Sequence, residues 1–134
     1  MKTCFEKCKL FLTKNNMSIE RINPTQRWSD ATVFNGTCHF VEVPGATEGV
    51  DIHQQTASLL ASAEANLARC RSDKSRLLQA TIFLTNFTNL AAFNAAWDAW
   101  LPAGAAPSRA CVKAELVDPN MLVEVAFVAA QLPT

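Results

Sequence analysis

Two ionisable residues near the end of the chain, Arg109 and Glu124, have types and positions that could do chemistry. Period-two alternation places Arg109 on one face of a strand together with Cys111. Glu124 follows in the next strand, where its neighbours on the same face are all apolar: Leu122, Ala126 and Val128. A guanidinium can bind a carboxylate through two parallel hydrogen bonds, and a carboxylate in a cleft can act as a general base. The pair therefore predicts a site for a small anion.

Spacing alone favours a structural interpretation of the same two residues. Their strands are expected to be antiparallel neighbours, so that Arg109 and Glu124 would form a cross-strand ion pair or lie on a solvated rim. In that case, both residues would contribute to stability and neither to chemistry.

The other reactive side chains give weaker signals. Cys111 could be a nucleophile, but a small buried strand cysteine is the simpler interpretation. His39 and His53 have no Ser or Cys partner at a recognised spacing, so we expect surface histidines. Cys4 and Cys8 lack further nearby ligands, and no metal site is predicted.

The elements that must position these residues can be read from periodicity. Asn35-Gly36 joins two β-rich runs and predicts a hairpin over 31–43, preceded by a short strand within 17–22. Apolar residues at steps of three and four predict helices over 51–70 and about 90–101. Further strands are predicted over 77–84, 108–116 and 122–130. In the second helix, Asn94 interrupts the apolar face, and we expect a buried amide that holds the backbone of a neighbouring loop.

This order of elements predicts an α+β fold in which one mixed sheet packs two helices on one of its faces. The other face must also be covered. Because neither face of the 31–43 hairpin is decisively polar, we expect self-association.

Composition limits the class of protein. The 134 residues are 49% hydrophobic and 18% charged, with 12 basic and 12 acidic side chains, which is typical of one compact domain. Zero net charge disfavours nucleic acid as a partner, and no apolar run is long enough to span a membrane. Five cysteines without paired spacing favour a reducing, cytoplasmic compartment.

Residues 1–16 differ from the rest of the chain. They hold four lysines and one glutamate, whereas the remainder carries a net charge of −3. We interpret residues 1–16 as an extension, disordered or outside the native start, and residues 17–134 as a single domain.

Several segments together resemble one known family. Ser108-Arg109-Ala110-Cys111-Val112 and Val123-Glu124-Val125 are similar to the C-terminal signature of the Rid family of reactive intermediate deaminases, also called the YjgF family. Supporting similarities run from Arg27 to Ala31, from Ala80 to Leu84 and from Phe93 to Trp100. The Trp-Asp-Ala-Trp helix followed by Pro-x-Gly is most similar to the YoaB-like subgroup.

The resemblance implies a chorismate-mutase-like fold, a homotrimer and clefts at the subunit interfaces. It also implies hydrolysis of enamines and imines, of the 2-aminoacrylate or 2-imino acid type, to 2-oxo acids and ammonia without a cofactor. By position, Arg109 would bind the substrate carboxylate, the Cys111 backbone would bond to the imine or the water, and Glu124 would orient the water. Two other functions stay open: a non-catalytic trimer that binds a small carboxylate, and an endoribonuclease.

The chain departs from the family pattern at two places in the implied substrate site. Trp28 stands where the archetypal enzymes carry a tyrosine, and Val41-Glu42-Val43 replaces a Ser-Gly-Gln segment. Both changes remove hydroxyl groups, so a more apolar cleft of different shape is expected, lined by Trp28 and Val41.

Overall fold

The computed structural model describes residues 17–134. The predictions for Cys4, Cys8 and the extension over 1–16 concern residues outside the described part of the chain. The strands are β1 (Glu20–Ile22), β2 (Ala31–Phe34), β3 (Thr37–Glu42), β4 (Leu77–Leu84), β5 (Ser108–Lys113) and β6 (Val123–Ala130). The helices are α2 (Ile52–Arg69) and α3 (Leu90–Trp100), with short 3-10 turns η1 (Lys74–Arg76) and η2 (Phe87–Asn89).

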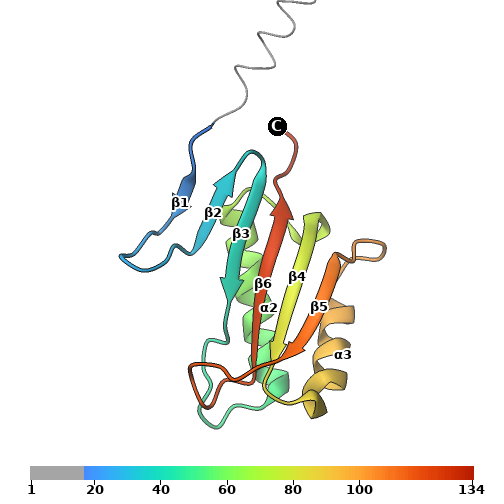
Figure 1. Ribbon diagram of the computed structural model, residues 1–134. Helices are drawn as coiled ribbons and strands as arrows, with labels where there is room; N and C mark the ends of the chain where they lie inside the picture. The colour runs from blue at the N-terminus through green and yellow to red at the C-terminus, as the bar shows by residue number, and fades with distance from the viewer. Residues whose placement is uncertain (1–16) are drawn as a thin grey trace, which may run out of the picture.

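The six strands form one sheet in the order β1-β2-β3-β6-β4-β5. Among the strand pairs of residues 17–134, only β4 and β5 are parallel, which requires a crossover, and α3 supplies it. Helix α2 supplies a second crossover, from β3 to β4, in the same direction across the sheet. Since such crossovers are almost always right-handed, both helices lie on the same face of the sheet (Figure 1). The predicted fold class is confirmed.

Local signals in the sequence explain the main elements. Asn35 and Gly36 both have positive φ, at 51° and 77°, as the tight turn between β2 and β3 requires. The Asp51 side chain accepts a hydrogen bond of 2.9 Å from the backbone N–H of Gln54 and caps α2. The helix then places its apolar stripe on the sheet.

The core lies between the sheet and its two helices. On β6 every second residue is buried, and these residues (Val123, Val125, Phe127 and Ala129) face the helices. Phe127 stacks on Phe40 of β3 at 5.0 Å between ring centroids, and on Trp97 of α3 at 6.2 Å. This aromatic cluster joins β3, β6 and α3, and so fixes the helix beside β5.

Gln55 ties two loops to α2, the one after β3 and the one before β6. Its fully buried side chain donates to the backbone oxygens of Val50 and Asn120, at 3.0 and 2.9 Å, and accepts from the N–H of Leu122 at 2.8 Å. A buried amide satisfied in this way fixes the loop that leads into β6.

The opposite face of the sheet carries no helix within residues 17–134. It presents apolar side chains, of which Phe34, Val41 and Val112 are exposed. Ala126 and Val128 of the central strand β6 are only half-buried there. An apolar surface of this kind is typical of an interface.

Candidate functional site

Arg109 lies at the beginning of the edge strand β5, and α3 holds its side chain. One guanidinium nitrogen donates a hydrogen bond of 2.7 Å to Oδ1 of Asn94. The guanidinium carbon also lies 5.9 Å from the ring centroid of Phe93 and 5.8 Å from that of Trp97, within range for cation–π attraction. No acidic side chain among residues 17–134 forms an ion pair with Arg109. An oriented guanidinium without a carboxylate partner is suited to bind an external anion.

Asn94 acts differently from the sequence prediction. It is half-buried rather than buried, and its amide oxygen accepts from Arg109 instead of holding a loop backbone. The buried amides that do hold backbone are Gln55 and Asn66, both on α2. The prediction was wrong because a gap in an apolar stripe does not show which neighbouring strand will lie opposite it.

Cys111 lies two residues after Arg109 on the same side of β5, half-buried against the core. Burial raises the pKa of its thiol, which disfavours the thiolate that a nucleophile needs. Its backbone is more informative. The N–H of Ala114, just past the strand, bonds to Leu84 O on β4. Because backbone groups alternate along a strand, the N–H of Cys111 points to the free edge, where a ligand could accept from it.

Glu124 does not lie beside Arg109. Strand β4 separates β5 from β6, so the expectation that their strands are antiparallel neighbours was wrong, and no cross-strand ion pair forms. Arg109 is paired with Ala80 of β4, and Glu124 with Phe83 of the same strand. Arg109 and Glu124 are therefore two strand spacings apart across the sheet and three residues apart along it. Strand spacing and rise put their Cα atoms roughly 14 Å apart. Arg109 faces the helices, whereas Glu124, half-buried, lies on the open face.

Glu124 instead lies near Val41. In the β3–β6 register, Val41 is opposite Ala126, so Glu124 is its diagonal neighbour on the open face. Val41 is 57% exposed and lines a cavity together with Trp28, which is 62% exposed. The six predicted site residues therefore form two groups: Arg109, Cys111 and Asn94 at the β5 edge, and Trp28, Val41 and Glu124 around β3 and β6.

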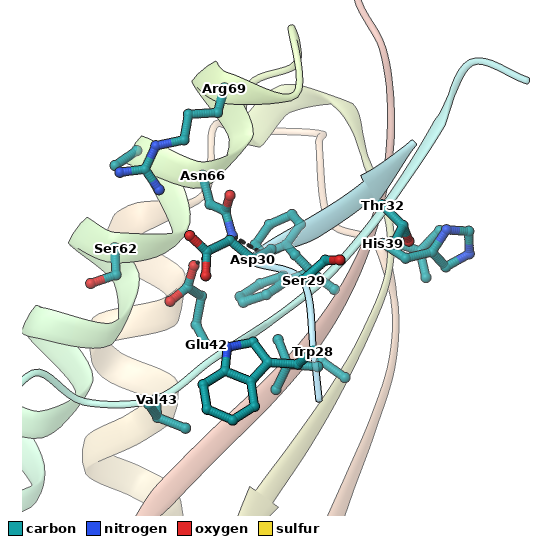
Figure 2. Close-up of a pocket in the computed structure, with 16 residues that line it drawn as sticks. Trp28, Ser29, Asp30, Thr32, His39, Glu42, Val43, Ser62, Asn66 and Arg69 are labelled. Carbon is teal, nitrogen blue, oxygen red and sulfur yellow. Dashed lines mark hydrogen bonds between the residues drawn. The ribbon is translucent and has the colours of Figure 1, made fainter. Parts of the chain in front are cut away.

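The cavity beside β3, of about 830 Å³, exists because β2 is shorter than β3. Their pairing begins at Thr32 opposite His39, while β3 continues to Glu42. The chain before Ala31 turns away, through a bond from Thr25 N–H to Trp28 O. The end of β3 is left without a partner strand on that side, and Trp28 lies across the gap (Figure 2).

The cavity is lined by both apolar and polar side chains. Besides Trp28, Val41 and Val43 it is lined by Asp30, Glu42, Asn66 and Arg69. Burial raises the pKa of Glu42, while a hydrogen bond from Asn66 opposes this shift. From the sequence, Glu42 was noted only as part of the Val41-Glu42-Val43 segment that departs from the family, and Asn66 was not predicted as a site residue. The position of Asn66 on the buried stripe of α2, where an amide must have partners, was the available signal.

The remaining candidates lie outside both groups. His53 is exposed at the beginning of α2, and His39 is exposed on the open face, at the rim of the cavity. Within residues 17–134 no cluster of three or more His, Cys, Asp or Glu side chains could hold a metal ion. In the same part of the chain, no helix is both long and apolar enough to cross a membrane.

A mixed sheet with two crossover helices on one of its faces defines a small α+β domain. The Endoribonuclease L-PSP family model matches residues 18–131, and the chain belongs to this family, also named YjgF or RutC. It is 45% identical to the RutC family protein YoaB of Escherichia coli over 114 residues, covering 85% of this chain and 99% of that protein. A RutC family protein of Haemophilus ducreyi is 38% identical over 112 residues, covering 84% and 96%.

Solved structures agree with this assignment. NMB1025 of Neisseria meningitidis, a member of the YjgF family, superposes with a TM-score of 0.84 at 38% identity, covering 88% of this chain and 98% of that chain. YyfA of Yersinia pestis, from the Rid family, has a TM-score of 0.78 at 24% identity, covering 84% and 99%, and supports the fold.

Proposed function

We propose that this protein is a deaminase that hydrolyses enamines and imines, of the 2-aminoacrylate or 2-imino acid type, to 2-oxo acids and ammonia. The observation that carries the proposal is Arg109: its guanidinium is oriented by Asn94 and two aromatic rings on an edge strand, and it has no carboxylate partner among residues 17–134. The family assignment supports the reaction class.

The separation of the two residue groups supports a site built from two copies of the chain. Arg109 and Cys111 of one copy would bind the substrate carboxylate and the imine or water, and Glu124, Trp28 and Val41 of a neighbouring copy would complete the cleft. The uncovered apolar face gives such copies a surface to bury. We therefore propose a homotrimer, with three such clefts.

The chemistry follows from these groups. Glu124 accepts a proton from water as the oxygen attacks the imine carbon, which forms a C–O bond and moves the C=N electron pair onto nitrogen. That proton passes to nitrogen, which gives a neutral carbinolamine. The hydroxyl proton then moves through Glu124 to the amino nitrogen, the C–N bond breaks, and ammonia leaves as the O–H electron pair forms the carbonyl. An enamine substrate first tautomerises to the imine by moving its N–H proton to the β carbon. Arg109 holds the carboxylate throughout. Every step uses water and side chains only, so we propose no cofactor and no metal.

Ammonia release tests the proposal directly. An amino-acid oxidase with catalase generates 2-iminobutanoate in situ, and the protein should accelerate its conversion to 2-oxobutanoate and ammonia above the spontaneous rate. If the protein binds 2-oxobutanoate but does not accelerate imine hydrolysis, the deaminase proposal is wrong and the protein is a non-catalytic trimer that binds a small carboxylate. Light scattering on the eluting peak should give three times 14.6 kDa, and a monomer at micromolar concentration would refute the shared site.

An endoribonuclease, as the family model is named, is not favoured by the charge. Residues 17–134 carry a net charge of −3, and RNA binding depends on basic surfaces.

A further inference from the structure

The inner wall of the cavity beside β3 contains acceptor groups that the deaminase reaction does not use. Asn66 Nδ2 donates to the backbone oxygen of Asp30 at 2.8 Å and to Oε1 of Glu42 at 3.1 Å. These bonds fix the Glu42 carboxylate in the cavity, as Figure 2 shows. Glu42 is half-buried at the end of β3, and its other oxygen, Oε2, has no hydrogen-bond partner among the described residues.

Asn66 is the second, independent feature of this wall. It lines the cavity and is only 3% exposed, yet its Oδ1 has no hydrogen-bond partner in the described part of the chain. Both Nδ2 hydrogens are already directed at acceptors, so the amide orientation is settled and the orphaned atom is an acceptor. An orphaned buried acceptor is costly, and it is satisfied by a donor.

The charges around the cavity favour a cationic group. Asp30 lines the same wall and raises the pKa of Glu42, whereas Arg69 at the rim lowers it. Arg69 is exposed and forms no ion pair within residues 17–134. Two carboxylates therefore face one guanidinium. The exposed indole of Trp28 also lines the cavity, beside Glu42, and an aromatic face attracts cations (Figure 2).

We propose that this cavity binds the side chain of a substrate that ends in an ammonium or guanidinium group, with Glu42 as the residue that selects it. This inference rests on the proposed function, since Trp28 and Val41 belong to the proposed cleft and also line this cavity, which continues around the edge of β3 to Glu42 on the side of α2. The cation donates to Glu42 and lies against Trp28, while Arg109 of the neighbouring copy holds the 2-carboxylate. An apolar side chain would leave Glu42 Oε2 without a donor, and an anionic one would meet two carboxylates.

Binding by itself gives the first test. Isothermal titration compares 5-aminopentanoate with pentanoate, which has the same chain and carboxylate but no ammonium group. We expect the ammonium compound to bind at least tenfold tighter, the effect of one charged hydrogen bond in a partly buried site. Glu42→Gln keeps an acceptor for Asn66, and should abolish this preference while leaving pentanoate binding within twofold. Glu48→Gln, an exposed carboxylate in the loop after β3, is the matched control and should retain the preference.

Equal affinities for the two compounds, or a preference that survives in Glu42→Gln, would overturn the inference. A thermal melt of each variant confirms that it is folded.

Turnover separates this inference from the proposed function. Imines of arginine and citrulline, generated by an amino-acid oxidase, have side chains of nearly equal shape and different charge. We expect kcat/KM at least tenfold higher for the arginine imine, and near equality in Glu42→Gln. If neither imine is hydrolysed but 5-aminopentanoate still binds more tightly than pentanoate, the deaminase proposal is wrong and the cation-binding inference stands. If both imines are hydrolysed at equal rates, the substrate class fails alone.

Discussion

Replacing Arg109 by lysine tests the site most directly, because the two side chains have the same charge. In the structure one guanidinium nitrogen donates to Asn94 at 2.7 Å while the plane lies near the rings of Phe93 and Trp97. The remaining N–H groups stay available as a planar pair. A lysine ammonium can reach Asn94 or a ligand, but it cannot present two parallel donors to a carboxylate.

The expected magnitude follows from these contacts. A charged hydrogen bond contributes about 1.5–3 kcal/mol, so Arg109→Lys should weaken 2-oxobutanoate binding by roughly tenfold to over a hundredfold. Stability should change little. Each cation–π contact at an exposed site contributes about 0.5–1 kcal/mol, and lysine retains part of it. One kcal/mol shifts the Tm of a domain of this size by about 3–5 °C, so we expect a loss below about 4 °C.

Isothermal titration with 2-oxobutanoate and a thermal melt on the same preparations give both numbers. Arg21→Lys, an exposed arginine on β1, is the control and should change neither. If Arg109→Lys binds the ligand within twofold of the unchanged protein, the anion-binding role of Arg109 is refuted. A large loss of Tm with unchanged affinity would show that Arg109 only stabilises α3 against β5.

Three further changes test other parts of the structure. Glu124→Gln should leave 2-oxobutanoate affinity nearly unchanged and reduce imine turnover by about 10² or more, in a steady-state ammonia assay; parallel losses of affinity and turnover would contradict a water-activating role. A chain beginning at Met17 should melt within about 2 °C of the full chain, and a drop of about 8 °C or more would show that residues 1–16 pack on the domain. Burial raises the pKa of the Cys70 thiol from its ordinary value near 9 to about 12. The folded state holds the thiol proton more tightly than the unfolded state does. The contribution of Cys70 to the free energy of unfolding is therefore complete below pH 9 and is lost progressively between pH 9 and 12. The difference in unfolding free energy between the unchanged protein and Cys70→Ala, from urea titrations at pH 7 and 10, should therefore shrink at the higher pH, and a constant difference would contradict this pKa.

The elements and the fold class were predictable because their signals are local. Asn35-Gly36 determines a turn through the positive φ of both residues, and the apolar stripe of α2 follows from helical period alone. The strand over 77–84 was predicted with the bounds that β4 has. The strand predicted over 108–116 ends at Lys113, since the chain leaves the edge of the sheet there. Arg109 and Glu124 were singled out as candidates from residue type and pattern, and Cys111 was added by the family resemblance.

Which of these residues lie together was decided only by the tertiary structure. Two strands that follow each other in sequence were expected to pair, but β4 inserts between β5 and β6. Strand order depends on crossover connections and on packing against both helices, which are interactions between residues far apart in sequence. The same long-range packing brings Asn94 to Arg109, separated by 15 positions, and Asn66 to Glu42, separated by 24. Alternation within a strand determines on which face a side chain lies, and the sheet determines which side chains it meets there.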